Sequence, residues 1–183
     1  MLEKPITVSC LTTRPDYADF KSAASKAMVN ENEIRFLRIT GCVLILAAFL
    51  LRAFFSGGFF QYAACTAMAA VGVIVGAFYD PIMRYTVRAH ALREYEDIKK
   101  KFFAQITEFG ESAVEIKTDR YTASIPYELF YKVYEDSRVF ILYTGINEMK
   151  FIPKRAMNEQ ECKQIQGILR SKLKEKYQQE GAR

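Results

Sequence analysis

Two long apolar runs interrupt an otherwise polar chain and predict a helical hairpin. Phe59–Tyr79 holds 21 residues without a charge, and a helix of that length spans about 30 Å, the thickness of a bilayer's hydrocarbon core. The first run is uncharged only over Ile39–Leu51, but it reaches a spanning length at about Phe36–Phe55, where Arg38 and Arg52 lie near its ends. We therefore expect two transmembrane spans, with a re-entrant segment as the alternative for the first.

Lysine and arginine residues are concentrated at the ends of the two runs that lie away from the turn between them. The turn side carries only Arg52. An excess of basic residues marks the cytoplasmic ends of spans, so we expect a multi-pass protein of the cell membrane with both termini in the cytoplasm. The basic residues before the runs are Lys21, Lys26, Arg35 and Arg38, and those after them are Arg84, Arg88, Arg93, Lys99, Lys100 and Lys101.

The segment before the first run predicts one strand and one helix. Ile6–Leu11 alternates apolar and polar side chains, as a half-buried strand does. Thr13–Val29 carries Tyr17 and Phe20 on one face at helical spacing. One strand and one helix cannot bury a core alone. We infer that the strand joins the sheet of the C-terminal part, so that the hairpin is an insertion into a single cytoplasmic module.

Short strands and one closing helix are predicted in the C-terminal part. Asn158 can cap the helix while Glu161 reaches back to it, and the apolar stripe of this helix should cover the open end of the sheet. The fold class is therefore α+β: a two-helix transmembrane hairpin with a small antiparallel β-barrel or sheet closed by a C-terminal helix. The strands are expected at Phe102–Phe109, Ser112–Thr118, Tyr121–Pro126, Tyr131–Glu135, Arg138–Tyr143 and Glu148–Pro153, with a short helical turn at Pro126–Phe130.

These elements divide the chain into four parts. They are a cytoplasmic strand and helix (1–34), the transmembrane hairpin (35–80, with spans at about 36–55 and 59–79), a polar juxtamembrane helix (81–101) and the cytoplasmic C-terminal domain (102–183). Asp80 and Pro81 interrupt the second apolar run, and Pro81 is expected to kink or restart the helix there.

Two segments of this chain resemble the YcxB-like family of bacterial membrane proteins. They are Thr12–Phe20, within the opening ITVSCLTTRPDYADF, and Phe151–Met157, which reads FIPKRAM before the last helix. Together with the two apolar runs, the similarity extends over nearly the whole chain. The resemblance implies a C-terminal domain that is pleckstrin-homology-like (PH-like), a small barrel closed by a helix, and it implies no defined biochemical role.

Neither composition nor motifs indicate catalysis. The formal charge of +5 is modest, and basic residues beside membrane spans account for it, so no nucleic-acid partner is expected. His90 is the only histidine, and the chain lacks the P-loop, GxGxxG, GxSxG and HExxH motifs. The four cysteines have no paired spacing. We therefore expect no enzyme, no cofactor and no metal site.

Two groups of basic residues are candidates for contact with lipid or with a partner. Lys154 and Arg155 follow a strand end just before the last helix, where exposed side chains could meet a lipid phosphate or an acidic partner. An ordinary solvated turn is the favoured alternative, because anionic-lipid sites usually contain about 4–8 basic residues. Lys99, Lys100 and Lys101 could also contact anionic lipid, although their place beside the membrane already explains them.

Gly72 and Gly76 form a GxxxG pair in the second span. Such a pair can form the face of a homodimer, or it can let the two helices of one hairpin pack closely. We favour packing within the hairpin, because the partner helix is already tethered nearby.

Four functions remain as hypotheses. The first is a membrane-anchored interaction module that binds an unknown protein partner, for instance by adding a strand to an open sheet edge. The alternative is sensing of anionic lipid at the inner leaflet, which high salt should weaken. Transport is disfavoured because neither span carries a charge at its middle. Catalysis is disfavoured by the lack of an activated constellation.

Overall fold

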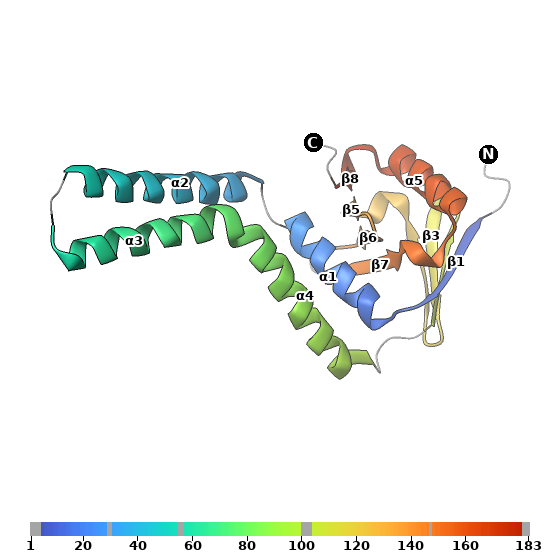
Figure 1. The fold of residues 1–183 in the computed structure, drawn as a ribbon. Helices are drawn as coiled ribbons and strands as arrows, with labels where there is room; N and C mark the ends of the chain where they lie inside the picture. Colours follow the sequence, from blue (N-terminus) through green and yellow to red (C-terminus); the bar gives the residue numbers. More distant parts are fainter. Residues whose placement is uncertain (1–4, 29–30, 55–56, 100–103, 147, 181–183) are drawn as a thin grey trace. The chain divides into compact units, whose positions relative to one another are not determined.

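The computed structural model describes residues 5–28, 31–54, 57–99, 104–146 and 148–180 (Figure 1). The chain folds as two compact units. The first contains residues 1–26 and 88–183, and the second contains residues 27–87. One unit is thus assembled from two stretches of chain that are separated in sequence by the other unit.

The second unit is a helical hairpin, as the apolar runs predict. Helix α2 spans Glu31–Phe54 and helix α3 spans Phe59–Val73. The apolar stretches Asn32–Phe54 and Phe59–Phe78 have mean hydropathies of 2.1 and 1.7, and they are long enough to cross a membrane. Little of either stretch is covered by the rest of the described chain. The two helices therefore have the length and composition of membrane spans.

The interruption at Pro81 widens the helix without ending it. A π-helical turn, Ile74–Phe78, follows α3, and helix α4 then runs over Tyr79–Ile98. Proline has no N–H to donate, and its ring clashes with the carbonyl four residues earlier, which is that of Ala77. A π turn changes the hydrogen-bond spacing at this position, so the helix passes the proline without a break.

Three glycines allow the hairpin helices to approach at backbone distance. A Cβ atom built on Gly41 of α2 would lie 2.6 Å from the carbonyl oxygen of Gly72 and 2.8 Å from Cα of Gly76. A Cβ atom on Gly72 would lie 2.8 Å from the carbonyl oxygen of Gly41. Gly72 and Gly76 thus face Gly41 inside the hairpin, and their role in a homodimer stays a prediction.

An antiparallel four-stranded sheet, sheet A, contains the N-terminal strand. Its strands are β1 (Ile6–Leu11), β2 (Ala104–Phe109), β3 (Ala113–Thr118) and β4 (Thr122–Pro126), in that order. Strands β1 and β2 pair from Ile6 opposite Phe109 to Leu11 opposite Ala104. The inference that the N-terminal strand joins the C-terminal sheet is therefore confirmed.

A second four-stranded sheet, sheet B, follows a 3-10 turn at Tyr127–Leu129. Its order is β7-β6-β5-β8. Helix α5, with the expected capping box between Asn158 and Glu161, precedes the last strand. The bounds are β5 Lys132–Glu135, β6 Val139–Tyr143, β7 Met149–Pro153, a 3-10 turn at Lys154–Ala156, α5 Glu159–Leu173, a 3-10 turn at Lys174–Lys176 and β8 Tyr177–Gln179.

The arrangement of the sheets corrects the expectation of a closed antiparallel barrel. Within the described residues, the hydrogen-bonded strands form two separate sheets: β4 ends at Pro126, the turn Tyr127–Leu129 follows it, and β5 does not pair with β4. Strand β8 was not predicted, and it pairs with β5 in parallel. Lys174, just before it, has a φ of 48°, a conformation that costs a residue other than glycine about 1–3 kcal/mol.

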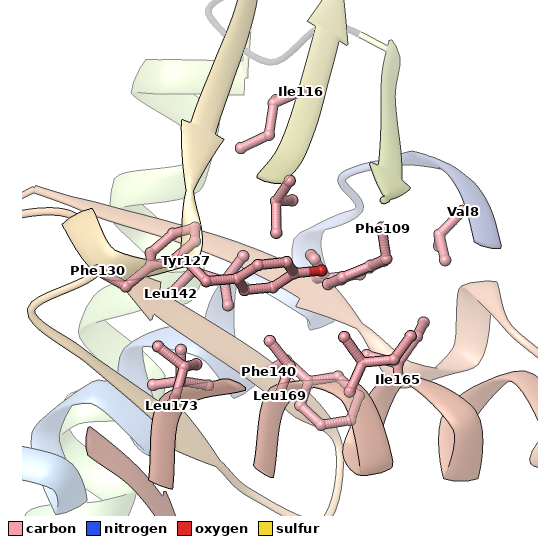
Figure 2. Close-up of a cluster of buried hydrophobic side chains, with 14 residues drawn as sticks. Val8, Phe109, Ile116, Tyr127, Phe130, Phe140, Leu142, Ile165, Leu169 and Leu173 are labelled. Carbon is pink, nitrogen blue, oxygen red and sulfur yellow. The ribbon is translucent and has the colours of Figure 1, made fainter. Parts of the chain in front are cut away.

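One hydrophobic core joins both sheets and α5. Figure 2 shows Ile165, Leu169 and Leu173 of α5 beneath the aromatic side chains of the strands and of the turn after β4. The hydroxyl group of Tyr127 donates to the carbonyl oxygen of Gly110, 3.0 Å away. The Tyr127 hydroxyl group is therefore satisfied within the core, and α5 closes the core as the sequence predicts.

Helix α1 (Arg14–Met28) covers the other face of sheet B (Figure 1). The ring of Phe20 stacks on the ring of Phe151 in β7, with centroids 4.4 Å apart. All five residues of β6 are buried, because this strand has the core on one face and α1 on the other. The continuous apolar run VFILY is typical of a strand that is covered on both faces.

The glycine contacts predict opposite effects for two Gly→Ala substitutions. Gly41→Ala should destabilise the hairpin by about 1–3 kcal/mol, because the added Cβ meets backbone atoms that cannot rotate away. Gly167→Ala, in open space on α5, should stabilise the protein by about 0.5–1 kcal/mol through helix propensity. Thermal unfolding in detergent, followed by circular dichroism, measures both. A Gly41→Ala protein as stable as the parent would contradict the close approach.

Candidate interaction surface

The grouping of ionisable side chains in the described residues bears on the kind of site that they could form together. No group of three or more His, Cys, Asp or Glu side chains in it could hold a metal ion. His90 lies exposed on α4. The ionisable side chains that do come together form ion pairs between elements of the fold. Those pairs determine which surfaces are left for a partner.

Arg155 forms a two-pronged ion pair with Asp16. Its Nε donates to Oδ1 over 2.6 Å and its Nη2 donates to Oδ2 over 2.5 Å. The Asp16 side chain is 5% exposed, whereas that of Arg155 is 52% exposed. Nη2 also donates to the carbonyl oxygen of Leu11, 3.1 Å away. The planar guanidinium group of Arg155 thus pairs with both oxygens of one buried carboxylate, a geometry that a lysine cannot provide.

Asp16 is positioned by the start of α1. The backbone N–H and the hydroxyl group of Thr13 donate to Oδ2 of Asp16 over 2.7 and 2.6 Å. A carboxylate at this place in the first turn satisfies the N–H of the residue before the helix, as in a capping box. Burial would raise the pKa of Asp16, but the hydrogen bonds from Arg155 and Thr13 outweigh burial and lower the pKa below its ordinary value.

The segments Thr12–Phe20 and Phe151–Met157 meet in space. Thr12–Phe20 contributes Asp16 and Phe20, and Phe151–Met157 contributes Arg155 and Phe151. The ion pair and the stacked rings join these segments across about 140 positions of sequence. Their side chains hold β1 and α1 against the end of β7.

Lys154 forms an ion pair with a second buried carboxylate, that of Glu135. Its Nζ lies 2.5 Å from Oε1 of Glu135, a residue that is 1% exposed. The side chains of Gln166 in α5 and Tyr177 in β8 also donate to this carboxylate. Burial, together with the hydrogen bond to Glu135, raises the pKa of Tyr177. The cluster joins β5, the turn after β7, α5 and β8.

Further ion pairs fix α1 between sheet B and the end of α4. Lys26 Nζ lies 2.8 Å from Oδ2 of Asp136 and 2.8 Å from Oε1 of Glu180. Asp19 Oδ1 accepts from Arg88 over 2.8 Å and from Arg138 over 2.9 Å. Because α1 is held at several points along its length, this face of sheet B is covered.

The remaining candidate basic residues are Lys99, Lys100 and Lys101. Lys99 pairs with Glu96 on the same helix at 2.9 Å, and both side chains are about half exposed. Lys100 and Lys101 lie outside the described residues. A role of any of the three in lipid contact stays a prediction.

The outer edge of β4 is the open edge of sheet A away from β1. Thr118 N donates to Tyr121 O over 2.9 Å, and Tyr127 N donates to Ser112 O over 3.3 Å. Residues of an antiparallel strand alternate between bonding to their neighbour and pointing away from it. Thr122 and Ser124 therefore direct their N–H groups outward. In the described residues, no strand pairs with this edge, and both side chains are exposed.

Sequence reasoning singled out Lys154 and Arg155 but not the carboxylates that they meet. Asp16 had a signal, because it lies three residues after Thr13 at capping-box spacing. Glu135 had none, since an acidic residue at a strand end is usually solvated. Strand β8 was also missed, because three polar-flanked residues carry no strand periodicity.

We expect the Arg155 fork to be a large contribution to stability. Arg155→Ala should lower the free energy of unfolding by about 3 kcal/mol, because Asp16 stays buried without its counter-charge. Arg155→Lys should recover only part of this loss. Lys163→Ala, which removes an exposed pair with Glu159 on α5, is the control and should have little effect. Urea unfolding at neutral pH measures all three, and equal small losses would contradict the prediction.

The lowered pKa of Asp16 predicts how stability depends on acid. A carboxyl group whose folded pKa is depressed stabilises the fold above its ordinary pKa of 3.8, and this contribution disappears as the pH falls through the folded value. The stability difference between the parent and Asp16→Asn should be constant near neutral pH and should shrink below about pH 4. Unfolding curves from pH 7 to 3 measure the difference. The exposed Asp97→Asn variant serves as the control, and a difference independent of pH would contradict the assignment.

Comparisons with known proteins bear on the second half of the chain. The family model of the YcxB-like proteins matches residues 109–169, which extend from the end of β2 into α5. A search of the curated proteins and a search of the solved structures gave no match. The matched region contains Arg155 and Phe151, whereas Asp16 lies outside it. The resemblance to the YcxB-like family is thus confirmed over residues 109–169, 61 of the 183 residues of the chain.

Proposed function

We propose that the chain is a membrane-anchored interaction module of the bacterial cell membrane. Helices α2 and α3 form a two-span hairpin, both termini are cytoplasmic, and the first unit is a PH-like domain that binds a protein segment. The open edge of β4 carries this proposal, because it offers outward N–H groups that an extended segment can use.

Several features support the membrane part of the proposal. The hairpin helices expose large apolar side chains along their length, as lipid-facing helices do. Phe54, Phe59 and Phe60 are more than three-quarters exposed at the turn end, and Arg52 lies over the ring of Tyr62 there. Aromatic and basic side chains of this kind suit the headgroup layer of a bilayer. Pairing of β1 with β2 requires both ends of the hairpin on one side.

The order of elements supports a PH-like domain. Four antiparallel strands are followed by three more and then by a helix that closes the core. In this proposal the hairpin is an insertion between the first and second strands of the domain. A small sheet-rich module with an uncovered edge strand suits the binding of an extended peptide.

The ion pairs favour a protein partner over anionic lipid. Lys154 and Arg155 were the main candidates for a lipid phosphate, but both face buried carboxylates of their own chain. A phosphate would have to replace those contacts and leave Glu135 or Asp16 buried without a counter-charge. The β4 edge carries no charged side chain, so strand pairing suits it better than electrostatic attraction to lipid does.

Photo-cross-linking in native membranes tests the proposal. A cross-linking amino acid in place of Thr122 should give protein adducts. Ser124→Pro, which removes an outward N–H group, should abolish the adducts, while Ser124→Ala should keep them. Lipid adducts alone, or protein adducts that survive Ser124→Pro in a folded chain, would contradict binding at this edge. Salt-sensitive adducts with anionic lipid would instead support the lipid alternative.

A further inference from the structure

Strand β8 differs from the other strands in how it is held. It contains three residues, it follows α5 and the 3-10 turn Lys174–Lys176, and it pairs with β5 in parallel, from Val133 opposite Tyr177 to Glu135 opposite Gln179. Its residues are only partly buried. Without β8, β5 would be an open edge of sheet B, as β4 is of sheet A. The C-terminal segment thus occupies a strand-binding edge of its own chain.

The occupied edge recognises alternate side chains of β8. The hydroxyl group of Tyr177 donates a hydrogen bond to the buried carboxylate of Glu135. Two residues on, Oε1 of Gln179 accepts from Nη2 of Arg170 in α5 over 2.7 Å. Both side chains face α5. In β8, a phenolic hydroxyl group and, two residues later, a hydrogen-bond acceptor thus make the side-chain contacts on this face.

The next residue is recognised from the other side. Oε1 of Glu180 lies 2.8 Å from Nζ of Lys26 in α1, and the backbone N–H of Glu180 donates to the carbonyl oxygen of Glu135 over 2.8 Å. An acidic side chain thus meets a lysine directly after the acceptor. The contacts of the segment are therefore made by a tyrosine, then, after one intervening residue, by an acceptor side chain and an acid.

The chain before β8 contains one residue in an uncommon backbone conformation. Lys174 has its φ of 48° at the point where α5 ends, and a non-glycine residue adopts this conformation only under constraint from its surroundings. Detachment of β8 would expose the row of backbone groups on β5 and the Glu135 carboxylate to a competing strand.

We propose that the β5 edge is a peptide-binding groove that the chain's own C-terminal segment occupies. A partner protein displaces this segment with a parallel strand of its own. That strand carries a tyrosine, an acceptor side chain and an acid at the spacing of Tyr177, Gln179 and Glu180. Binding at the β4 edge is not required. The groove lies between α5 and α1, and both helices supply side chains that select the strand. Displacement makes binding of the partner depend on release of the tail.

Competition between tethered and free strands tests this groove in the full chain in detergent. The probe is a fluorescein-labelled peptide with the sequence of residues 174–180, and fluorescence anisotropy measures its binding. Glu180 directs its N–H toward β5, so Gln178, two residues earlier on the strand, does so too. Gln178→Pro removes this donor and weakens the tethered strand, whereas Gln178→Ala keeps it.

The peptide should bind the Gln178→Pro chain at least about 10-fold more tightly than the parent or the Gln178→Ala chain, because a tethered strand competes at a high effective concentration. A Tyr177→Phe peptide, which lacks the hydroxyl group, should bind more weakly. Equal affinity for all three chains, or no binding to a folded Gln178→Pro chain, would overturn the proposal.

Two further variants separate the remaining outcomes. If Gln178→Pro unfolds the domain, a chain ending at Lys176 replaces it, and unfolding of that chain as well would show that β8 is an obligatory strand and overturn the proposal. Ser124→Pro alters only the β4 edge, so it should leave peptide binding at the β5 edge unchanged. Loss of cross-links at β4 and loss of peptide binding at β5 are therefore distinguishable results.

Discussion

The pairing of β1 with β2 is the constraint on which the rest of the structure depends. Six residue pairs join a strand that precedes the hairpin to a strand that follows it. Once these strands are paired, the chain between them must leave and return at the same end of sheet A. This requirement brings Thr13 and Asp16 close to Arg155, and it allows α1 to cover sheet B. A hairpin of two helices meets this requirement.

Buried carboxylates make this assembly specific. Burying Asp16 or Glu135 without a partner would cost several kcal/mol of folding free energy. Each carboxylate is therefore paired with a basic side chain. Arg155 and Lys154 are neighbours in sequence, yet they point to different carboxylates in different parts of the domain. The turn after β7 therefore connects the N-terminal segment, sheet B and α5 through these two ion pairs.

The outer edge of β4 and the edge of β5 that β8 occupies have different properties for a partner. The β4 edge is bare and uncharged, and it offers outward backbone groups without side chains that would select a sequence. The β5 edge is filled by β8 and is flanked by Glu135, Arg170 and Lys26, which select side chains. An uncharged edge suits a broad class of extended segments, whereas a lined edge suits a narrow one.

Local patterns in the sequence determined the hairpin helices, the strand positions, the closing helix and its Asn158 cap, because hydrophobic period and capping act over a few residues. They also singled out the segments Thr12–Phe20 and Phe151–Met157. Tertiary structure alone decided that these segments meet, that Gly41 faces Gly72, that the strands form two sheets and that β8 pairs in parallel. Each of these depends on contacts between residues far apart in the chain, about which the period of side chains carries no information.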